Sequence, residues 1–227
     1  MDIMMAALAI LPAIVLITYI YKHDTVEKEP AGLLAKLFFL GMASTIPAAI
    51  IESVGDGFLL SLFPGNSLLY HLLENFLVVA LVEESFKYLI LKRKTWRSSH
   101  FNYTFDAVVY AVVVSLGFAT LENILYVMQG GFGTAITRAI FSVPGHAIDA
   151  VFMGYFYGLA KQSERLGDVA KSSKNLLLAL VVPICIHGFY DFAIATSSFL
   201  VFLAFEVVIT IIAIRRVRKL SSEDAPI

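Results

Sequence analysis

Long apolar stretches recur along nearly the whole chain and restrict it to one class of fold. Several of them exceed the ~18 residues that mark a bilayer-spanning helix. Only 15% of the 227 residues are charged, against roughly 25% in a soluble domain. Because the bilayer core offers the backbone no hydrogen-bond partner, runs of this length must be helices. The sequence therefore predicts an all-α, polytopic transmembrane helical bundle.

Polar breaks and breaks containing Gly or Pro divide the apolar sequence into seven predicted spans. They cover residues 3–22, 33–52, 68–92, 105–128, 135–160, 175–197 and 199–215. Asp2, and no Lys or Arg, precedes the first span, which therefore lacks the basic region of a signal peptide and is predicted to be retained.

Basic residues gather in alternate breaks and in the tail, with only Arg138 in the other breaks and Lys87 inside a span. By the positive-inside rule, the N-terminus is predicted outside and the C-terminus in the cytoplasm.

Composition also limits the domain organisation and the partners. No repeat or linker divides the apolar sequence, so residues 1–219 are predicted to form a single transmembrane domain, followed by a short polar cytoplasmic tail at 220–227. Topology and contact with anionic lipid account for the basic clusters. With a net charge of -1, no nucleic-acid partner is expected. Cys185 is the single cysteine, which excludes an intramolecular disulfide.

Charged and imidazole side chains inside the predicted spans are the main functional signal. Each charge at a helix centre costs ~2.5–3.5 kcal/mol, so these groups must face the bundle interior and pair with one another. The set comprises Glu83, Glu84, Lys87, Glu122, His146, Asp149, His187 and Asp191. We expect them to share a polar site within the membrane.

Two adjacent carboxylates stand in the middle of the third span. Glu83 and Lys87 are four residues apart, in the order that favours a helical ion pair. Glu84 lies ~100° round the helix from Glu83, so we expect that one lysine cannot serve both carboxylates equally. The glutamate that Lys87 does not neutralise would then be available as a general base.

Two histidines each have an aspartate on the same predicted helix face. His146 and Asp149 are three residues apart, and His187 and Asp191 are four apart. We expect each aspartate to orient its imidazole and to fix its tautomer. Glu122 and Asn123 add an acid and an amide to the set of catalytic candidates.

Carboxylates and histidines without a nucleophilic Ser or Cys suit the activation of water for attack on a carbonyl group. Neither His-Glu-x-x-His nor Gly-x-Ser-x-Gly occurs in the chain. A zinc site could still assemble across helices from Glu84, His146 and His187, because two His and one Glu form a known catalytic ligand set. The spacing leaves the metal open, and activation of water by glutamate alone remains the alternative.

Two other classes of function fit a buried polar set. A proton-coupled transporter also uses buried acids and histidines as a relay. An inverted repeat would support that reading, and none is found in the sequence. In a non-catalytic membrane scaffold, the same groups would only specify helix packing.

Five motifs, in the same order along the chain, resemble the PrsW family of bacterial intramembrane proteases. They are Glu-Glu-Ser-Phe-Lys (83–87), Phe-Asp-Ala-Val-Val-Tyr (105–110), Gly-Phe-Ala-Thr-Leu-Glu-Asn-Ile-Leu-Tyr (117–126), His-Ala (146–147) and His-Gly-Phe-Tyr-Asp-Phe (187–192). That family is similar in turn to the CAAX-type prenyl-protein endopeptidases, whose first motif is Glu-Glu-x-x-x-Arg. Here Lys87 stands one position earlier than that arginine.

The resemblance implies a multi-pass protein of the bacterial cell membrane that makes the site-1 cut in a single-span anti-sigma factor such as RsiW. Under envelope stress, this cut would lead to release of a sigma factor. The resemblance also implies that Glu83, Glu84 and His187 are needed for activity. Its implied site partners are Glu122, His146 and Asp191.

The depth of Glu83 conflicts with cleavage near the outer surface. If the third span starts at Leu68 on the outside, Glu83 lies ~22 Å down, beyond the bilayer midplane. Either residues 70–75 lie along the membrane surface, or a wet cavity reaches inward. We favour the cavity.

Overall fold

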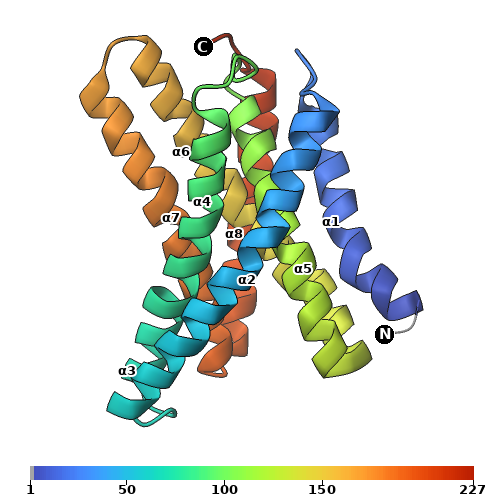
Figure 1. The fold of residues 1–227 in the computed structure, drawn as a ribbon, viewed down its shortest axis with the longest axis vertical. Coiled ribbons are helices and arrows are strands. Elements are labelled where there is room, and N and C mark those ends of the chain that lie inside the picture. Colours follow the sequence, from blue (N-terminus) through green and yellow to red (C-terminus); the bar gives the residue numbers. More distant parts are fainter. Residues whose placement is uncertain (1–2) are drawn as a thin grey trace.

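The computed structural model describes residues 3–227, which form an elongated bundle of helices (Figure 1). Its α-helices are α1 (Ile3–His23), α2 (Ala31–Leu62), α3 (Leu68–Leu73), α4 (Leu81–Thr95), α5 (Asp106–Thr137), α6 (Val143–Arg165), α7 (Val169–Ala195) and α8 (Phe199–Ser222). Two π-helical segments, η1 (Glu74–Ala80) and η2 (Arg138–Ser142), join α3 to α4 and α5 to α6. Over residues 3–227, β pairing is limited to one bridge between Tyr103 and Pro226. The predicted all-α class is confirmed.

Four helical stretches are long and apolar enough to cross a membrane. They are Ile3–His23, Ala31–Leu62, Asp106–Arg165 and Val169–Ala195. The third has 60 residues and contains α5, η2 and α6, with a sharp kink at Gly131, where φ is 71°. An L side chain would be strained at that backbone conformation. Membrane-spanning character is therefore established, whereas the seven-span topology and its orientation stay predictions.

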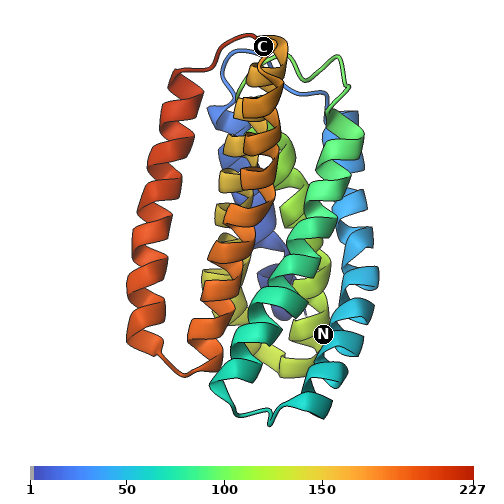
Figure 2. The same ribbon diagram turned by 90° about the vertical axis from the view of Figure 1, so that its left-hand side faces the viewer.

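The second helix is longer than predicted. The Gly-Asp-Gly sequence at 55–57 was expected to break the chain after residue 52, but α2 continues to Leu62. Packing explains the difference, because a Cβ at Gly55 would lie 2.8 Å from Val78 Cγ1 on η1. The next residue, Asp56, accepts a hydrogen bond from the Tyr70 hydroxyl of α3. Figure 1 and Figure 2 show α2 beside the α3–η1–α4 arm at the α3 end of the bundle.

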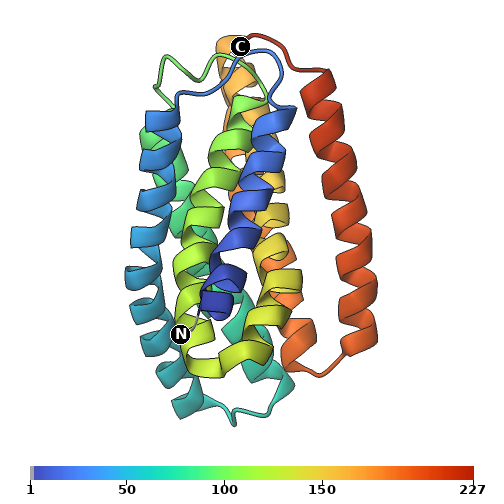
Figure 3. The same cartoon turned by 90° about the vertical axis from the view of Figure 1, so that its right-hand side faces the viewer.

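Helix α5 is the core of the bundle, and its first half is almost completely buried. At Gly117 of α5 an added Cβ would lie 2.1 Å from Phe38 O, so α2 approaches at backbone distance. On another side, a Cβ at Gly154 of α6 would meet Val108 Cα at 2.6 Å, and one at Gly158 would meet Thr104 O at 2.9 Å. Gly154 and Gly158 form a Gly-x-x-x-Gly sequence, and these small residues allow α5 and α6 to pack closely. Helix α1 crosses α5 on a further face (Figure 3).

The loops after α1, α4 and α6 and the C-terminal tail meet at one end of the bundle (Figure 1). The tail is attached there, because the amide of Ile227 donates to Asn102 O at 2.7 Å. The amide of Phe105 donates to Asp224 Oδ1 at 2.8 Å. Helix α8 itself runs to Ser222. The division into a domain ending at 219 and a separate tail stays a prediction.

Candidate active site

The site is built where four helices, α4, α5, α6 and α7, meet near the middle of the bundle. The first turns of α4 carry Glu83, Glu84 and Lys87, directly after the π-helical segment η1. Wide π turns are frequent at functional sites, because they re-aim the side chains that follow them. A Cβ at Gly188 of α7 would lie 2.6 Å from the Phe76 ring of η1. This close approach brings His187 beside the two glutamates.

Lys87 is the centre of the site and is completely buried. Its ammonium donates to Glu83 Oε2 at 2.9 Å, to Glu84 Oε1 at 2.8 Å and to His146 Nδ1 at 3.1 Å. The expectation that one lysine could not serve both carboxylates equally is wrong, because the two distances are nearly the same. Residues three and four positions before a lysine both lie on its helix face, and the long side chain places Nζ between them.

His187 lies between two carboxylates. Its Nδ1 is 2.9 Å from Glu84 Oε1, and its Nε2 is 3.2 Å from Asp191 Oδ2. The predicted pairing of His187 with Asp191 is therefore confirmed. A ring that faces a carboxylate on both sides can donate to both only when both nitrogens carry a proton.

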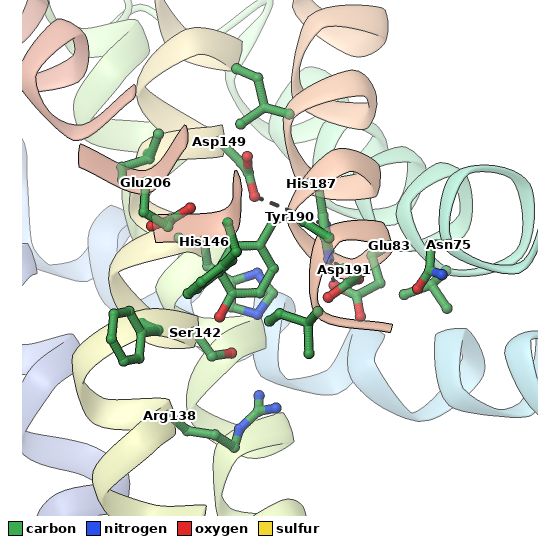
Figure 4. Close-up of a pocket in the computed structure, with 18 of the residues that line it drawn as sticks. Asn75, Glu83, Arg138, Ser142, His146, Asp149, His187, Tyr190, Asp191 and Glu206 are labelled. Carbon is green, nitrogen blue, oxygen red and sulfur yellow. Dashed lines mark ion pairs between the residues drawn. The ribbon is translucent and has the colours of Figure 1, made fainter. Parts of the chain in front are cut away.

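His146 has partners other than the predicted one. Its Nε2 lies 2.9 Å from Glu122 Oε2, whereas Asp149 Oδ2 is instead 3.9 Å from Nδ1 of His187. The predicted His146–Asp149 pair is wrong, because Asp149 faces His187 of α7, as Figure 4 shows, and His146 bonds Glu122 of α5 instead. An ammonium only donates, so Nδ1 must accept from Lys87, and the proton of a neutral ring is on Nε2, facing Glu122.

Arg138 of η2 connects Glu122 and Asn123. Its Nη2 donates to Glu122 Oε2 at 2.6 Å, and its Nε donates to Asn123 Oδ1 at 2.9 Å. The amide of Asn123 in turn donates to Ala9 O of α1 at 2.9 Å. Asn123 thus lies behind the cavity wall and fixes Arg138. In the sequence, Arg138 served only to assign the topology. It is the one basic residue in the breaks that otherwise lack them, and this isolation was a signal of a role at the site.

A cavity of about 690 Å³ opens onto this site. Its polar lining includes Glu52, Glu83, Glu122, Arg138, His146, Asp149, His187, Tyr190, Asp191 and Glu206. Figure 4 shows the labelled members of this set pointing into one space from α6, α7, α8 and the α4 arm. The structure thus contains a cavity at the site, whereas its filling by water and its opening toward the outer surface stay predictions. Glu84 and Lys87 lie behind Glu83.

Two acids of the cavity wall, Glu52 and Glu206, were not among the predicted site residues. Glu52 was read as the end of a span, whereas it lies well inside α2. Glu206 of α8 is 8% exposed, and no hydrogen bond or ion pair joins its side chain to any residue in the described range 3–227. The cost of burying a carboxylate would have identified Glu52 had the end of α2 been known, and it applied to Glu206 already, because that residue lies inside the predicted span 199–215.

The site also contains a group of residues that could hold a metal ion. Glu83, Glu84, His146 and His187 each offer one ligand atom, and these atoms lie within 4.8 Å of one another. The group includes the three predicted zinc ligands, and its donor types suit zinc. The Lys87 ammonium bonds Glu83, Glu84 and His146, so it would compete with a metal for the same lone pairs.

Comparison with known proteins places this geometry in context. The chain matches the family described as PrsW family intramembrane metalloprotease over residues 29–215. It is 36% identical to the Protease PrsW of Oceanobacillus iheyensis over 92% of this chain and 93% of the relative. It is 38% identical to the Protease PrsW of Bacillus subtilis over 83% and 82%, respectively. No solved structure gives a significant match.

A helical membrane bundle with buried carboxylates and histidines at a cavity, matched to these relatives, defines an intramembrane endopeptidase. The chain belongs to the PrsW family of intramembrane metalloproteases. Its location is therefore the membrane, and its substrates are membrane proteins.

Proposed function

We propose that this protease makes the site-1 cut in a single-span anti-sigma factor similar to RsiW, which leads to release of a sigma factor under envelope stress. One observation carries the catalytic part of this proposal. Glu83 stands at the end of a cavity inside a membrane bundle, paired with a buried lysine and surrounded by two histidines.

Glu83 is the proposed general base. Its Oε2 accepts from Lys87, whereas no side chain of residues 3–227 bonds Oε1, and the residue lines the cavity. Glu84 is fully buried and binds both Lys87 and His187 through Oε1. The two adjacent glutamates would therefore differ in role, with Glu83 meeting water and Glu84 holding its neighbours in place.

The reaction follows from this arrangement. Glu83 takes a proton from a water molecule as the water oxygen bonds to the substrate carbonyl carbon, and the carbonyl oxygen becomes an oxyanion. The Glu83 carboxyl then gives that proton to the leaving nitrogen, and the C–N bond breaks. The products are a new carboxyl group and a new amine, and Glu83 returns to its carboxylate form.

The oxyanion needs a hydrogen-bond donor within the cavity. His187 lines the cavity together with Asp191, the partner of its Nε2, whose side chain is 27% exposed. Arg138 lines the same wall from η2 and keeps guanidinium N–H groups beyond those used by Glu122 and Asn123. We assign His187 as the donor nearest the base and Arg138 as the donor on the opposite wall.

Zinc, if bound, would be held by Glu84, His146 and His187. It would supply Lewis-acid polarisation of the carbonyl group and a more acidic bound water. Metal analysis of purified active protein, together with anomalous scattering at the zinc edge, tests this assignment. One zinc per chain with a peak among these residues supports it, and full activity without the metal overturns it.

We further propose seven spans, with the N-terminus outside and the C-terminus cytoplasmic. Helices α1, α2, the α3–η1–α4 arm, α5, α6, α7 and α8 would be the spans. At about 1.5 Å per residue, His187 lies about 12 Å from the end of α7 at Ala195 and about 27 Å from its start at Val169. With Ala195 outside, the site falls in the outer half of the bundle, which supports a site-1 cut.

Reconstitution in detergent with a single-span anti-sigma substrate tests the proposed function. The wild type is expected to cut the substrate at one position, whereas Glu83→Gln and His187→Ala stay folded and inactive. Glu223→Gln is the control, because this glutamate lies at the exposed end of α8, far from the cavity. Cleavage by both site variants at the wild-type rate would refute the catalytic assignment.

A further inference from the structure

We infer that a second cavity, between α2, η1 and α5, is the path by which water reaches Glu83 while the substrate occupies the first cavity. This cavity has a volume of about 370 Å³. The inference rests on the proposed hydrolysis, because it assigns the source of the attacking water.

Helix α2 presents a polar stripe to this second cavity. The lining residues of α2 are Thr45, Ala49, Glu52, Ser53 and Asp56. Their spacing of three and four residues places them on one helix face. Neighbouring positions Ile46, Ile50 and Val54 are 58%, 60% and 70% exposed and face outward. A stripe with hydroxyl and carboxyl groups inside a membrane bundle indicates contact with water, because lipid cannot satisfy such groups.

The two cavities meet at the base. Both are lined by Glu52, Glu74, Val79, Glu83, Glu122 and Tyr126. The second cavity reaches Glu83 from the α2 side without touching either histidine or Arg138. The first contains those groups together with Phe141, Phe199 and Phe202. The first cavity thus holds the groups proposed to act on the substrate carbonyl, whereas the second lacks both histidines and Arg138 and reaches only the proposed base, which suits a supply of water.

Glu52 marks the inner part of the water path. Its Oε1 is shielded from solvent and has no hydrogen-bond partner among residues 3–227. Buried carboxyl oxygens normally have a partner, and water supplies one where protein does not. The cavity has room for on the order of ten water molecules. A water bonded to Glu52 Oε1 would lie beside Glu83, since both residues line the same space.

Packing holds the path open and defines its mouth. The close contact between Gly55 and Val78 fixes the distance between α2 and η1. At the end of the stripe, the Tyr70 hydroxyl donates to Asp56 Oδ1 and ties α3 to α2. Glu74 also lines this end, and its carboxylate is 3.7 Å from His71 Nδ1. These polar groups form an entrance at the α3 end of the bundle.

A substrate segment creates the need for a second path. When the segment fills the first cavity, it displaces the water there and closes that route to Glu83. Hydrolysis consumes one water per turnover, so water must enter from another side. The second cavity supplies it and leaves the substrate undisturbed.

Cysteine labelling tests the path without requiring turnover. Replacing Cys185 by Ser gives a background without thiols. Single cysteines are then placed at Ser53 in the second cavity, at Phe202 in the first, and at Val54 on the outward face of α2 as a matched control. A charged, water-soluble thiosulfonate is applied in membranes, with and without a single-span substrate that Glu83→Gln binds but does not cut.

Ser53→Cys is expected to react at the same rate with and without the substrate. Phe202→Cys is expected to react only without it, and Val54→Cys not at all. The water path is refuted if Ser53→Cys is unreactive, if it reacts no faster than Val54→Cys, or if the substrate protects it as it protects Phe202→Cys. Labelling without the substrate does not depend on proteolysis, so failure of the proposed function would leave this readout intact.

A kinetic test uses a bulky side chain that obstructs the second cavity. Ala49→Phe fills the second cavity, and the expected result is at least a tenfold lower kcat with KM unchanged, because binding of the substrate is separate from the supply of water. Ile50→Phe adds the same ring on the outward face and should retain wild-type kinetics. A wild-type kcat in folded Ala49→Phe contradicts the inference. If Ala49→Phe does not fold, the labelling result decides.

Discussion

Two buried clusters of acids in this protein are neutralised in opposite ways. The active-site cluster centres on Lys87, whose ammonium bonds both Glu83 and Glu84 within 2.9 Å. The second, which we call the loop-end cluster, consists of Asp24, Glu29, Asp106, Tyr110 and Asp224 at the end where the loops and the C-terminal tail meet. Within the described residues 3–227, none of its acids has a cation within ion-pair distance.

Neutral donors hold the loop-end cluster together. Glu29 Oε2 accepts from the Tyr110 hydroxyl at 2.5 Å. Asp106 Oδ2 accepts from the amide of Tyr103 at 2.7 Å, and Asp224 Oδ1 accepts from the amide of Phe105 at 2.8 Å. These bonds join two loops, the start of α5 and the tail, so the cluster has a structural role.

The contrast shows what a buried carboxylate needs in order to stay charged. A fixed cation stabilises the ionised form, as Lys87 does in the active site, whereas burial without a cation favours the protonated form. Burial raises the pKa of the Asp24 carboxyl to about 6, against the opposing effect of Lys28. Burial likewise raises the pKa of Glu29. A general base must be ionised in order to accept a proton, whereas a carboxyl group that only holds loops together can be protonated.

The largest expected effect comes from removing the base. Glu83→Gln keeps the shape of the side chain but cannot accept a proton, so cleavage should fall about 10²–10⁴-fold. The melting temperature should change little, because the amide still accepts from Lys87. Glu29→Gln in the loop-end cluster is the matched control, with activity within about twofold of the wild type. Equal loss of activity in both variants would remove the distinction between the clusters.

Removing the cation should destabilise the active-site cluster. Lys87→Met leaves Glu83 and Glu84 buried without a partner, and the free energy of unfolding should fall by about 3–5 kcal/mol. Lys28→Met, beside the loop-end cluster, should cost no more than about 1 kcal/mol, because Lys28 is exposed and bonds only backbone carbonyl groups. Thermal unfolding in detergent compares the two. Similar shifts in both variants would contradict the contrast.

A smaller effect is expected at Arg138, which acts on the active site from its edge. Arg138→Gln removes the cation from Glu122 and loosens the alignment of His146, so kcat should fall about tenfold. The pH profile of kcat should shift as well, which loss of packing alone would not cause. Arg138→Lys should recover part of the activity, because the charge returns without the two-armed geometry. An unchanged profile in Arg138→Gln would exclude this role.

The smallest effect concerns the pH dependence of stability at the loop-end cluster. The folded state holds the Asp24 proton more tightly than the unfolded state, because its folded pKa of about 6 exceeds the ordinary value of 3.8. The stabilisation is therefore fully present below about pH 4 and is lost as the pH rises through about 6, a change of about 1 kcal/mol after screening by solvent. Asp24→Asn should flatten this step in thermal unfolding. A step of unchanged size in the variant would assign it to another group.

Much of the fold followed from the sequence, because burial in lipid imposes a simple rule on long apolar runs. The predicted span 3–22 matches α1, whereas α7 begins at Val169 rather than at 175 and α8 ends at Ser222 rather than at 215. The end of α2 was missed because glycines at 55–57 also read as a break, and only the neighbouring Val78 and Tyr70 show why the helix continues. The sequence around a residue does not reveal which residue of another helix packs against it.

The sequence by itself determined which residues belong to the site, since a charge in an apolar span is costly wherever the helix packs. It thereby selected Glu83, Glu84, His187 and their partners. Only the tertiary structure decided which of these side chains pair with one another. It placed Lys87 between both glutamates, turned Asp149 away from His146, and brought Arg138 to Glu122. Pairing depends on the rotation of each helix about its own axis, which close contacts such as that between Gly188 and Phe76 set across the bundle.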